Sequence, residues 1–444
     1  DIDDISNIID KELKQFKNYI KNNNKININN IKIKSSKLNN KHLSSKKNNN
    51  IKPFSSVKNI VNINNIKNKN VSNSINNSQS KKIINEIKKD EYNNKINLKY
   101  FTKSKGYNYI FGYDFVQNNK DNIELIINGK KNILINEYEL KEGENIITMV
   151  IKNKITNLSY MFSLCNSLID ITELKYLDVT DITNFSYMFS QCKSLSNINS
   201  LQNWIVSNGN NFEGMFFYCS SLLDINSLQN WNVSNAHSFA NMFYGCSLLS
   251  DIKSLQNWNV LNSNNFANMF YKCTSLSNIN SLQNWNTSHV NNLEGMFYGC
   301  SILSNIKSLE KWNVSNVKNF SNMFNGCSLL SDISPLQNWN VSNCINFGWM
   351  FAECSFLSEI KSLQNWNVSN SNNFEGMFSG CSSLSDLQPL KDWNVSKCNN
   401  FSYMFKGCSS LSDIKALQNW NVSNSNNFRD IFFGCSLLRD INSL

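Results

Sequence analysis

The fold follows from one repeated sequence, Asn313-Val-Ser-Asn-Val-Lys-Asn-Phe-Ser-Asn-Met-Phe-Asn-Gly-Cys327, because close copies of it recur along most of the chain. Its Cys and a preceding Trp each repeat every 27 residues, without insertion between the Trp-bearing copies. A fixed period in the twenties predicts a repeat solenoid built of short coils. The repeated residues are Cys165, Cys192, Cys219, Cys246, Cys273, Cys300, Cys327, Cys354, Cys381, Cys408 and Cys435, with Trp204, Trp231, Trp258, Trp285, Trp312, Trp339, Trp366, Trp393 and Trp420.

The apolar residues inside one unit explain why the units must stack. Most of them, such as Leu195, Ile198 and Leu201, are three residues apart, which is typical of neither a long amphipathic helix nor a sustained strand. A single coil of this kind has no core of its own, so its neighbours above and below must supply one. The alternation of Trp204 and Val206 favours a short strand there.

The repeats divide the chain into three parts. Residues 155–444 are expected to form about eleven coils, and the last unit stops before its Trp, which we interpret as truncation. Residues 99–154 are expected to form a small β cap that covers the open core of the first coil. Within it, Asn128-Gly129 between residues 123–127 and 133–135 predicts a type I′ hairpin, and residues 145–151 predict a third strand.

The N-terminal segment, residues 1–98, has a different composition. Residues 1–100 contain 21 Lys and 8 acidic residues, so their positive charge exceeds the net charge of +10 of the whole chain. They are also rich in Asn. Such a segment buries too little apolar surface to offset its ordering entropy, and we expect a disordered tail. Apolar spacing and a Ser cap suggest short helices near residues 4–21 and 80–91.

The basic tail raises the question of nucleic-acid binding, since clustered Lys releases counterions from phosphates. The tail has no Arg for bidentate base contacts and almost no aromatic residues for stacking, which argues against that function. The apolar runs are also far too short for a transmembrane segment.

The repeat resembles those of BspA-like surface proteins, a divergent leucine-rich-repeat family. The similarity rests on the quoted stretch together with the Cys-x-x-Leu-x-x-Ile that follows it, and it covers about residues 155–444. The resemblance implies a leucine-rich-repeat-like, right-handed coil stack that is displayed on a cell surface or secreted. It also implies a surface for adhesion or protein binding, without naming a ligand.

The 13 Cys do not indicate disulfides or a metal site. Eleven share one repeat position, so each has identical neighbours on both sides, and no Cys-x-x-Cys motif exists. Stacking of coils about 4.8 Å apart places Cys344 and Cys398, two coils apart, beyond the reach of a disulfide. We interpret the Cys and Trp as structural ladders. His237 and His289 lack a nearby nucleophile motif or metal-ligand spacing, so we predict no enzyme, metal or cofactor.

Two further repeat positions are candidates for function. An Asp, Asn or Glu follows each ladder Cys by five residues, and stacked carboxylates could bind Ca²⁺. The interspersed Asn instead favour a side chain that caps a turn. The second position varies: it holds Tyr187, Trp349 and Tyr403 in some units and Gly or Asn in others. Variable occupancy suggests exposure, so these three aromatics are candidate contact residues.

These observations favour a non-enzymatic adhesion or protein-binding solenoid with an unidentified protein or cell-surface ligand. The alternative is an intracellular, cytoplasmic scaffold whose Lys-rich tail binds an acidic partner or nucleic acid.

Overall fold

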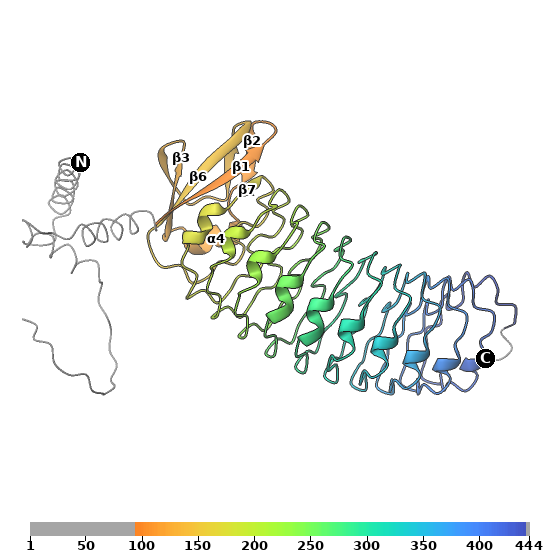
Figure 1. Ribbon diagram of the computed structural model, residues 1–444. Coiled ribbons are helices and arrows are strands. Elements are labelled where there is room, and N and C mark those ends of the chain that lie inside the picture. Colours follow the sequence, from red (N-terminus) through yellow and green to blue (C-terminus); the bar gives the residue numbers. More distant parts are fainter. Residues whose placement is uncertain (1–93, 441–444) are drawn as a thin grey trace, which may run out of the picture. The chain divides into compact units, whose positions relative to one another are not determined.

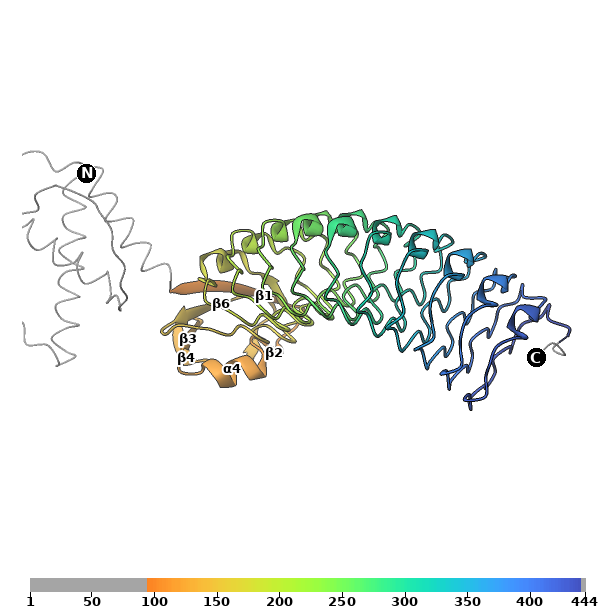
Figure 2. The same ribbon diagram turned by 90° about the horizontal axis from the view of Figure 1, so that it is seen from below.

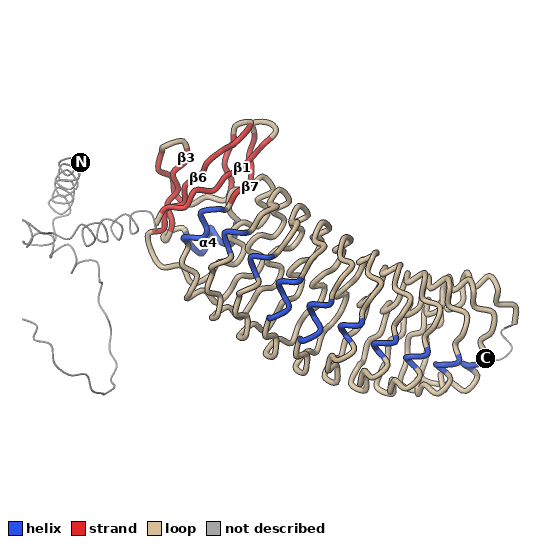
Figure 3. Tube along the Cα trace, viewed as in Figure 1, coloured by secondary structure: helices blue, strands red, loops and turns tan. Residues whose placement is uncertain are grey.

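The structure is a computed structural model, and it describes residues 94–440 of the 444-residue chain. The short helices expected near residues 4–21 and 80–91, and nearly all of the expected tail, lie outside the described residues. Strands gather at the start of the described part, and one 3₁₀ helix then recurs in each coil (Figures 1 and 3). The elements are β1 (Lys95–Thr102), β2 (Gly106–Tyr109), α4 (Tyr113–Asn119), β3 (Ile123–Ile127), β4 (Lys130–Ile133), β5 (Glu137–Leu140), β6 (Gly143–Ile151), β7 (Leu168–Asp170), η2 (Thr172–Tyr176), η3 (Asn199–Leu201), η4 (Asn226–Leu228), η5 (Lys253–Asn257), η6 (Asn280–Asn284), η7 (Lys307–Leu309), η8 (Ser334–Leu336), η9 (Lys361–Leu363), η10 (Gln388–Leu390) and η11 (Lys415–Leu417).

The N-terminal β unit is larger than the sequence suggests. Its main sheet has the strand order β4-β3-β6-β1-β7, with antiparallel pairs, and β2 pairs with β5 separately. The expected boundary at residue 98 is wrong, because β1 already begins at Lys95. Ile96, Leu98 and Tyr100 alternate along β1 and are fully buried, so the strand belongs to the core despite its Asn- and Lys-rich surroundings.

The predicted hairpin forms, but its second strand is shifted. Asn128 and Gly129 have φ values of 52° and 74°, which a type I′ turn requires at both central residues. The two-residue loop pairs Ile127 directly with Lys130. The second strand is therefore β4 and ends at Ile133, whereas the sequence suggested residues 133–135.

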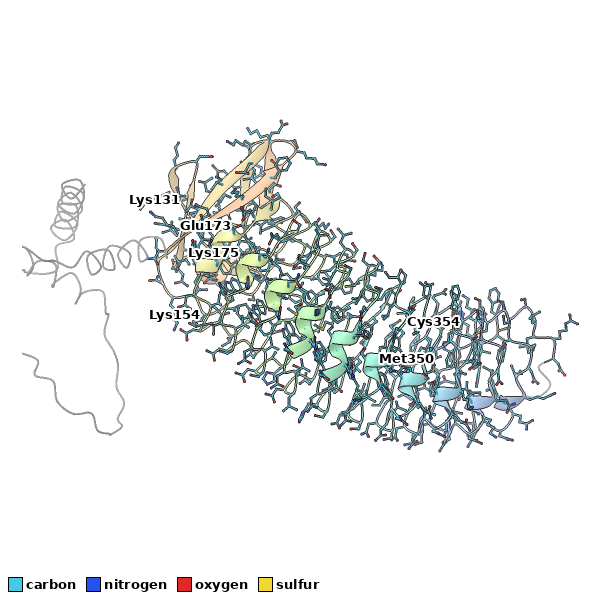
Figure 4. The ribbon with its side chains drawn as sticks, in the orientation of Figure 1. Lys131, Lys154, Glu173, Lys175, Met350 and Cys354 are labelled. Atoms are coloured by element: carbon cyan, nitrogen blue, oxygen red, sulfur yellow. The ribbon has the colours of Figure 1, made fainter. Side chains whose placement is uncertain are left out.

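The β unit packs directly on the first coil. The Phe111 ring stacks on Phe162 at 5.5 Å between centroids, and the backbone N–H of Gly112 donates to the Met161 carbonyl at 2.9 Å. The side chain of Glu173 in η2 accepts the Asn97 backbone N–H at 2.6 Å, and it lies beside the sheet in Figure 4. Because β7 comes from the first coil and pairs with β1, the sheet and the coils share one core.

The coils stack through isolated parallel β-bridges. The residue before the Phe of each unit, usually Asn, bridges the equivalent residue of the next coil, from Asn157 with Asn184 to Asn400 with Asn427. The strand expected at Trp204 and Val206 does not form. The Asn Oδ1 accepts the backbone N–H two residues later and so bends the chain. Beyond this bend the pairing continues as single backbone hydrogen bonds to the next coil, such as Tyr187 N–H to the Glu213 carbonyl at 2.7 Å and Phe189 N–H to the Met215 carbonyl at 2.8 Å.

The core is a set of aromatic ladders that runs through the stack. Phe rings of successive coils lie face to face, with centroids 5.2 Å apart for Phe185 and Phe212 and 5.9 Å apart for Phe378 and Phe405. Figure 2 shows that the stack curves, with its 3₁₀ helices along the convex side. Residues 155–440 are therefore a repeat solenoid, and each coil contributes one layer of its core.

Candidate contact surface

The Cys and Trp ladders hold neighbouring coils together. Each ladder thiol from Cys192 onward donates to the carbonyl of the Phe 30 residues earlier, as Cys192 does to Phe162 at 3.1 Å. Each ladder indole donates likewise to a Leu carbonyl 30 residues earlier, at 2.9 Å for Trp204 and Leu174. All 13 Cys are free thiols and buried, and burial raises the pKa of Cys219 and Cys300 to about 12. These thiols stay protonated and are poor nucleophiles.

The acidic ladder caps the 3₁₀ helices. Asp251 Oδ1 accepts the backbone N–H of Lys253 at 2.8 Å, and Asn278 makes the same bond to Asn280. Asp and Asn are interchangeable here because both supply the accepting oxygen, which supports the capping interpretation over the calcium one. Among residues 94–440, no three His, Cys, Asp or Glu side chains are grouped as metal ligands.

Each coil contains one turn with two left-handed residues. The first lies five residues before the ladder Cys and the second directly before it, and both have positive φ in every coil. Gly and Asn, the residues that tolerate this conformation best, fill many of these positions. For a bulky side chain, the left-handed conformation costs about 1–3 kcal/mol. We call the six residues that precede each ladder Cys the contact edge; residues 348–353 form it in the coil of Cys354 (Met350 and Cys354 are labelled in Figure 4).

The three candidate contact residues all lie in this edge, at its first left-handed position. Tyr187, Trp349 and Tyr403 have φ values of 54°, 58° and 60°. Each side chain is half-buried rather than freely exposed. Two factors therefore explain why the residue type varies at this position: partial exposure of the side chain, and a left-handed backbone that favours Gly or Asn.

The rings of Trp349 and Tyr403 meet across a glycine. Their centroids are 5.8 Å apart, although the residues lie two coils from each other. Gly376 occupies the same position in the coil between them, and a Cβ there would lie 2.4 Å from Cε3 of Trp349. The structure thus brings two of the three candidate residues together, whereas Tyr187 lies elsewhere along the edge and stacks on Tyr160 at 5.2 Å.

The largest aromatic group of the edge is not among the residues predicted from the sequence. Phe217, Tyr244, Tyr271 and Tyr298 lie two residues before successive ladder Cys, with ring centroids 4.7, 4.1 and 4.2 Å apart. All four are half-buried. The signal was present in the sequence, because an aromatic residue stands two positions before Cys in four consecutive units.

The surface aromatics of the solenoid concentrate on the contact edge. Among residues 155–440, every aromatic side chain outside the core Phe and Trp ladders lies in it, apart from Tyr176 and Phe356. The other residues of the edge that are not buried include Gly and Asn together with charged residues such as Lys272, Glu353 and Lys406. Rigid Tyr and Trp side chains among polar residues are typical of protein-binding loops.

Comparison with known families identifies the repeat. A family model described as "Mycoplasma protein of unknown function, DUF285" matches residues 138–252, 266–387 and 332–443. The chain belongs to the DUF285 family. The first matched segment begins within β5, so the DUF285 match reaches from the β unit through the coils. Searches among curated proteins and among solved structures found no match.

Between residues 94 and 440, no helix combines the length and the apolar character needed to cross a bilayer.

Proposed function

We propose that the chain is a non-enzymatic protein-binding solenoid, and that the contact edge is its binding surface. The observation that carries this proposal is the presence of Tyr187, Trp349 and Tyr403 at left-handed positions, where Gly or Asn costs less. Strained residues that persist against such a cost are typical of functional sites. Tyr, Trp and Arg are also the residues that contribute most to protein interfaces.

The rigidity of the stack supports the same function. The edge is held by backbone hydrogen bonds between neighbouring coils, such as those from Tyr187 N–H to the Glu213 carbonyl at 2.7 Å and from Phe189 N–H to the Met215 carbonyl at 2.8 Å, so its rings are ordered before a partner binds. Because the surface is already ordered, less conformational entropy is lost when a partner binds.

The proposal also covers the type of repeat and the place where the protein acts. We propose a leucine-rich-repeat-like, right-handed stack of the BspA-like kind that acts in adhesion at a cell surface. The repeated motif around Met-Phe-x-Gly-Cys and the 27-residue period support it.

Site-specific photo-crosslinking tests the binding surface. A p-benzoylphenylalanine would replace Tyr271 or Tyr403 in the edge, or Gln364 as a control on the exposed end of η9. In the cells that make the protein, we expect crosslinked protein adducts from the two edge positions and not from Gln364. Adducts that form equally at all three positions, or at Gln364 alone, would contradict the proposal. Digestion of intact cells with a protease tests surface display, which predicts cleavage of the chain without lysis.

A further inference from the structure

An apolar stripe follows the contact edge over three consecutive coils. Ile302, Leu329 and Phe356 each lie two residues after a ladder Cys, and their side chains are 41%, 42% and 59% exposed. Six other coils have Ser at this position: Ser167, Ser194, Ser221, Ser275, Ser383 and Ser410. The position therefore does not need an apolar residue for folding, and three adjacent exposed apolar side chains indicate a contact site.

The segments that flank this stripe carry charges of one sign only, and the nearest basic residues along the chain, Lys307 and Lys361, follow two residues after their ends. We define the docking face as residues 294–305, 321–332, 348–359 and 375–386, which run from six residues before to five residues after Cys300, Cys327, Cys354 and Cys381. It contains no Lys, Arg or His. Its acidic residues are Glu294, Asp332, Glu353, Glu359, Glu375 and Asp386.

Taken together, the same positions in the other coils carry both signs of charge. Residues 186–197, 213–224, 240–251 and 267–278 include Lys193 and Lys272 along with three acidic residues. The last two coils include Lys406, Arg429 and Arg439. The coils of Cys165, Cys219 and Cys246 also carry only acidic residues at these positions, but no other run of four consecutive coils lacks a basic residue there.

The carboxylates of the docking face are not neutralised within the solenoid. Across residues 94–440, none of the six lies within 4.0 Å of a Lys or Arg nitrogen, although ion pairs occur elsewhere, such as Lys154 with Asp181 at 2.6 Å. Glu294 and Glu375 accept only neutral side-chain hydrogen bonds, from Asn319 and Asn400. Unpaired charges of one sign around an apolar centre favour a partner of the opposite charge.

We infer that the docking face binds a basic amphipathic segment of a partner protein, with apolar side chains on Ile302, Leu329 and Phe356 and Lys or Arg near the acids. This inference rests on the proposed function and names the chemistry of the partner. Apolar burial supplies affinity at the stripe, and the acidic rim speeds encounter and rejects acidic partners. Because the rim is exposed to solvent, salt weakens its contribution.

Peptide binding to the full chain tests this inference. The probe is a fluorescein-labelled peptide of about 20 residues, with Leu at helical spacing and Lys elsewhere, and its counterpart carries Glu in place of Lys. Fluorescence anisotropy should show binding of the Lys peptide that weakens with added salt and little binding of the Glu peptide. Equal binding of both peptides, or none of either, would overturn the inference.

Matched substitutions show whether the peptide binds at the docking face or is attracted to acidic residues anywhere on the protein. Leu329→Ser and Phe356→Ser introduce the residue that other coils have, so the fold is preserved, and each should raise the Kd about tenfold. Leu248→Ser is the control, since Leu248 is 48% exposed at the same position outside the docking face, and it should change the Kd less than about twofold. Equal effects of Leu248→Ser and Leu329→Ser would refute the assignment of the site.

Charge substitutions test the rim in the same way. Asp332→Asn with Asp386→Asn keeps the caps, because Asn occupies this ladder position in other coils, and it should weaken binding and reduce its dependence on salt. Asp224→Asn with Asp251→Asn is the control outside the docking face.

Two further outcomes would show that the docking face binds a second copy of the chain, or that this inference fails while the proposed function stands. If the chain self-associates in sedimentation and Phe356→Ser abolishes this, the occupant is a second copy and the inference is wrong. If the Lys peptide fails to bind but edge crosslinks still form, this inference fails and the proposed function stands.

Discussion

Gly376 provides a sensitive test of the contact edge. Its φ is +56°, and a Cβ on this residue would lie 2.4 Å from Cε3 and 2.5 Å from Cδ2 of Trp349. Carbon atoms in contact normally lie about 3.5–4.0 Å apart, so the Trp349 ring would have to move by about 1 Å. Gly376→Ala should therefore disturb both the backbone and the aromatic pair that spans this position.

The two costs can be estimated separately. The left-handed conformation costs a residue with a Cβ about 1–2 kcal/mol. Forcing a methyl group against a packed ring costs about 1–3 kcal/mol more. Gly376→Ala should thus lower the free energy of unfolding by about 2–5 kcal/mol.

Gly407→Ala is the matched control. Gly407 also has a left-handed backbone, with φ +72°, but its Cβ would meet only the Gly380 backbone at 3.6 Å, an ordinary contact distance. The control should therefore cost only the backbone term of about 1–2 kcal/mol.

Urea denaturation of the full chain, followed by circular dichroism, measures these differences as shifts of the unfolding midpoint. In a Trp349→Asn background, Gly376→Ala should cost no more than Gly407→Ala, because the ring is gone. If Gly376→Ala is no more harmful than Gly407→Ala in the unsubstituted chain, the described packing of Trp349 on Gly376 is wrong.

Three further predictions test the ladders. Burial raises the pKa of Cys219 and Cys300 to about 12, whereas an unfolded thiol titrates near pH 8.5, so the unfolded chain loses its thiol protons first. Urea melts should show stability falling as pH rises from about 8.5 towards 12, and a pH-independent midpoint over this range would contradict the ladder. Asp251→Ala should cost about 0.5–2 kcal/mol in thermal unfolding, while Asp251→Asn should be nearly neutral; a Ca²⁺-dependent Tm would favour the calcium interpretation instead. Trp366→Phe leaves the Leu336 carbonyl, now bonded at 3.1 Å, without its indole donor and should cost about 1–3 kcal/mol in urea; no loss would mean that this hydrogen bond contributes little.

The stack of coils could be predicted from the sequence because the Cys and Trp that repeat along the chain have the same structural role in every coil. Cys354 and Trp366 bond the preceding coil through the same atoms as every other ladder Cys and Trp, so their spacing alone defines a coil. The turn with two left-handed residues could not be predicted. At these positions Tyr187, Trp349 and Glu353 stand in place of Gly or Asn and conceal the backbone requirement.

The β unit was predicted in part, and the strand expected at residues 145–151 is confirmed as β6. Asn128-Gly129 marked one hairpin, but β1 lies in a stretch whose Lys and Asn hide the alternation of Ile96 and Leu98. Helix α4 has no side-chain cap, and few of its residues are buried, so nothing in its local sequence signalled a helix.

Binding of a protein partner at the contact edge can be tested by a single affinity measurement. A partner recovered by crosslinking would be titrated against the chain with Tyr244, Tyr271 and Trp349 replaced by Asn, the residue that Asn322 and Asn325 already provide at these two positions. We expect the Kd to rise at least about tenfold, while Gln337→Ala with Gln364→Ala on the 3₁₀ helices changes it less than about twofold. An unchanged Kd in the edge variant would contradict binding at the contact edge.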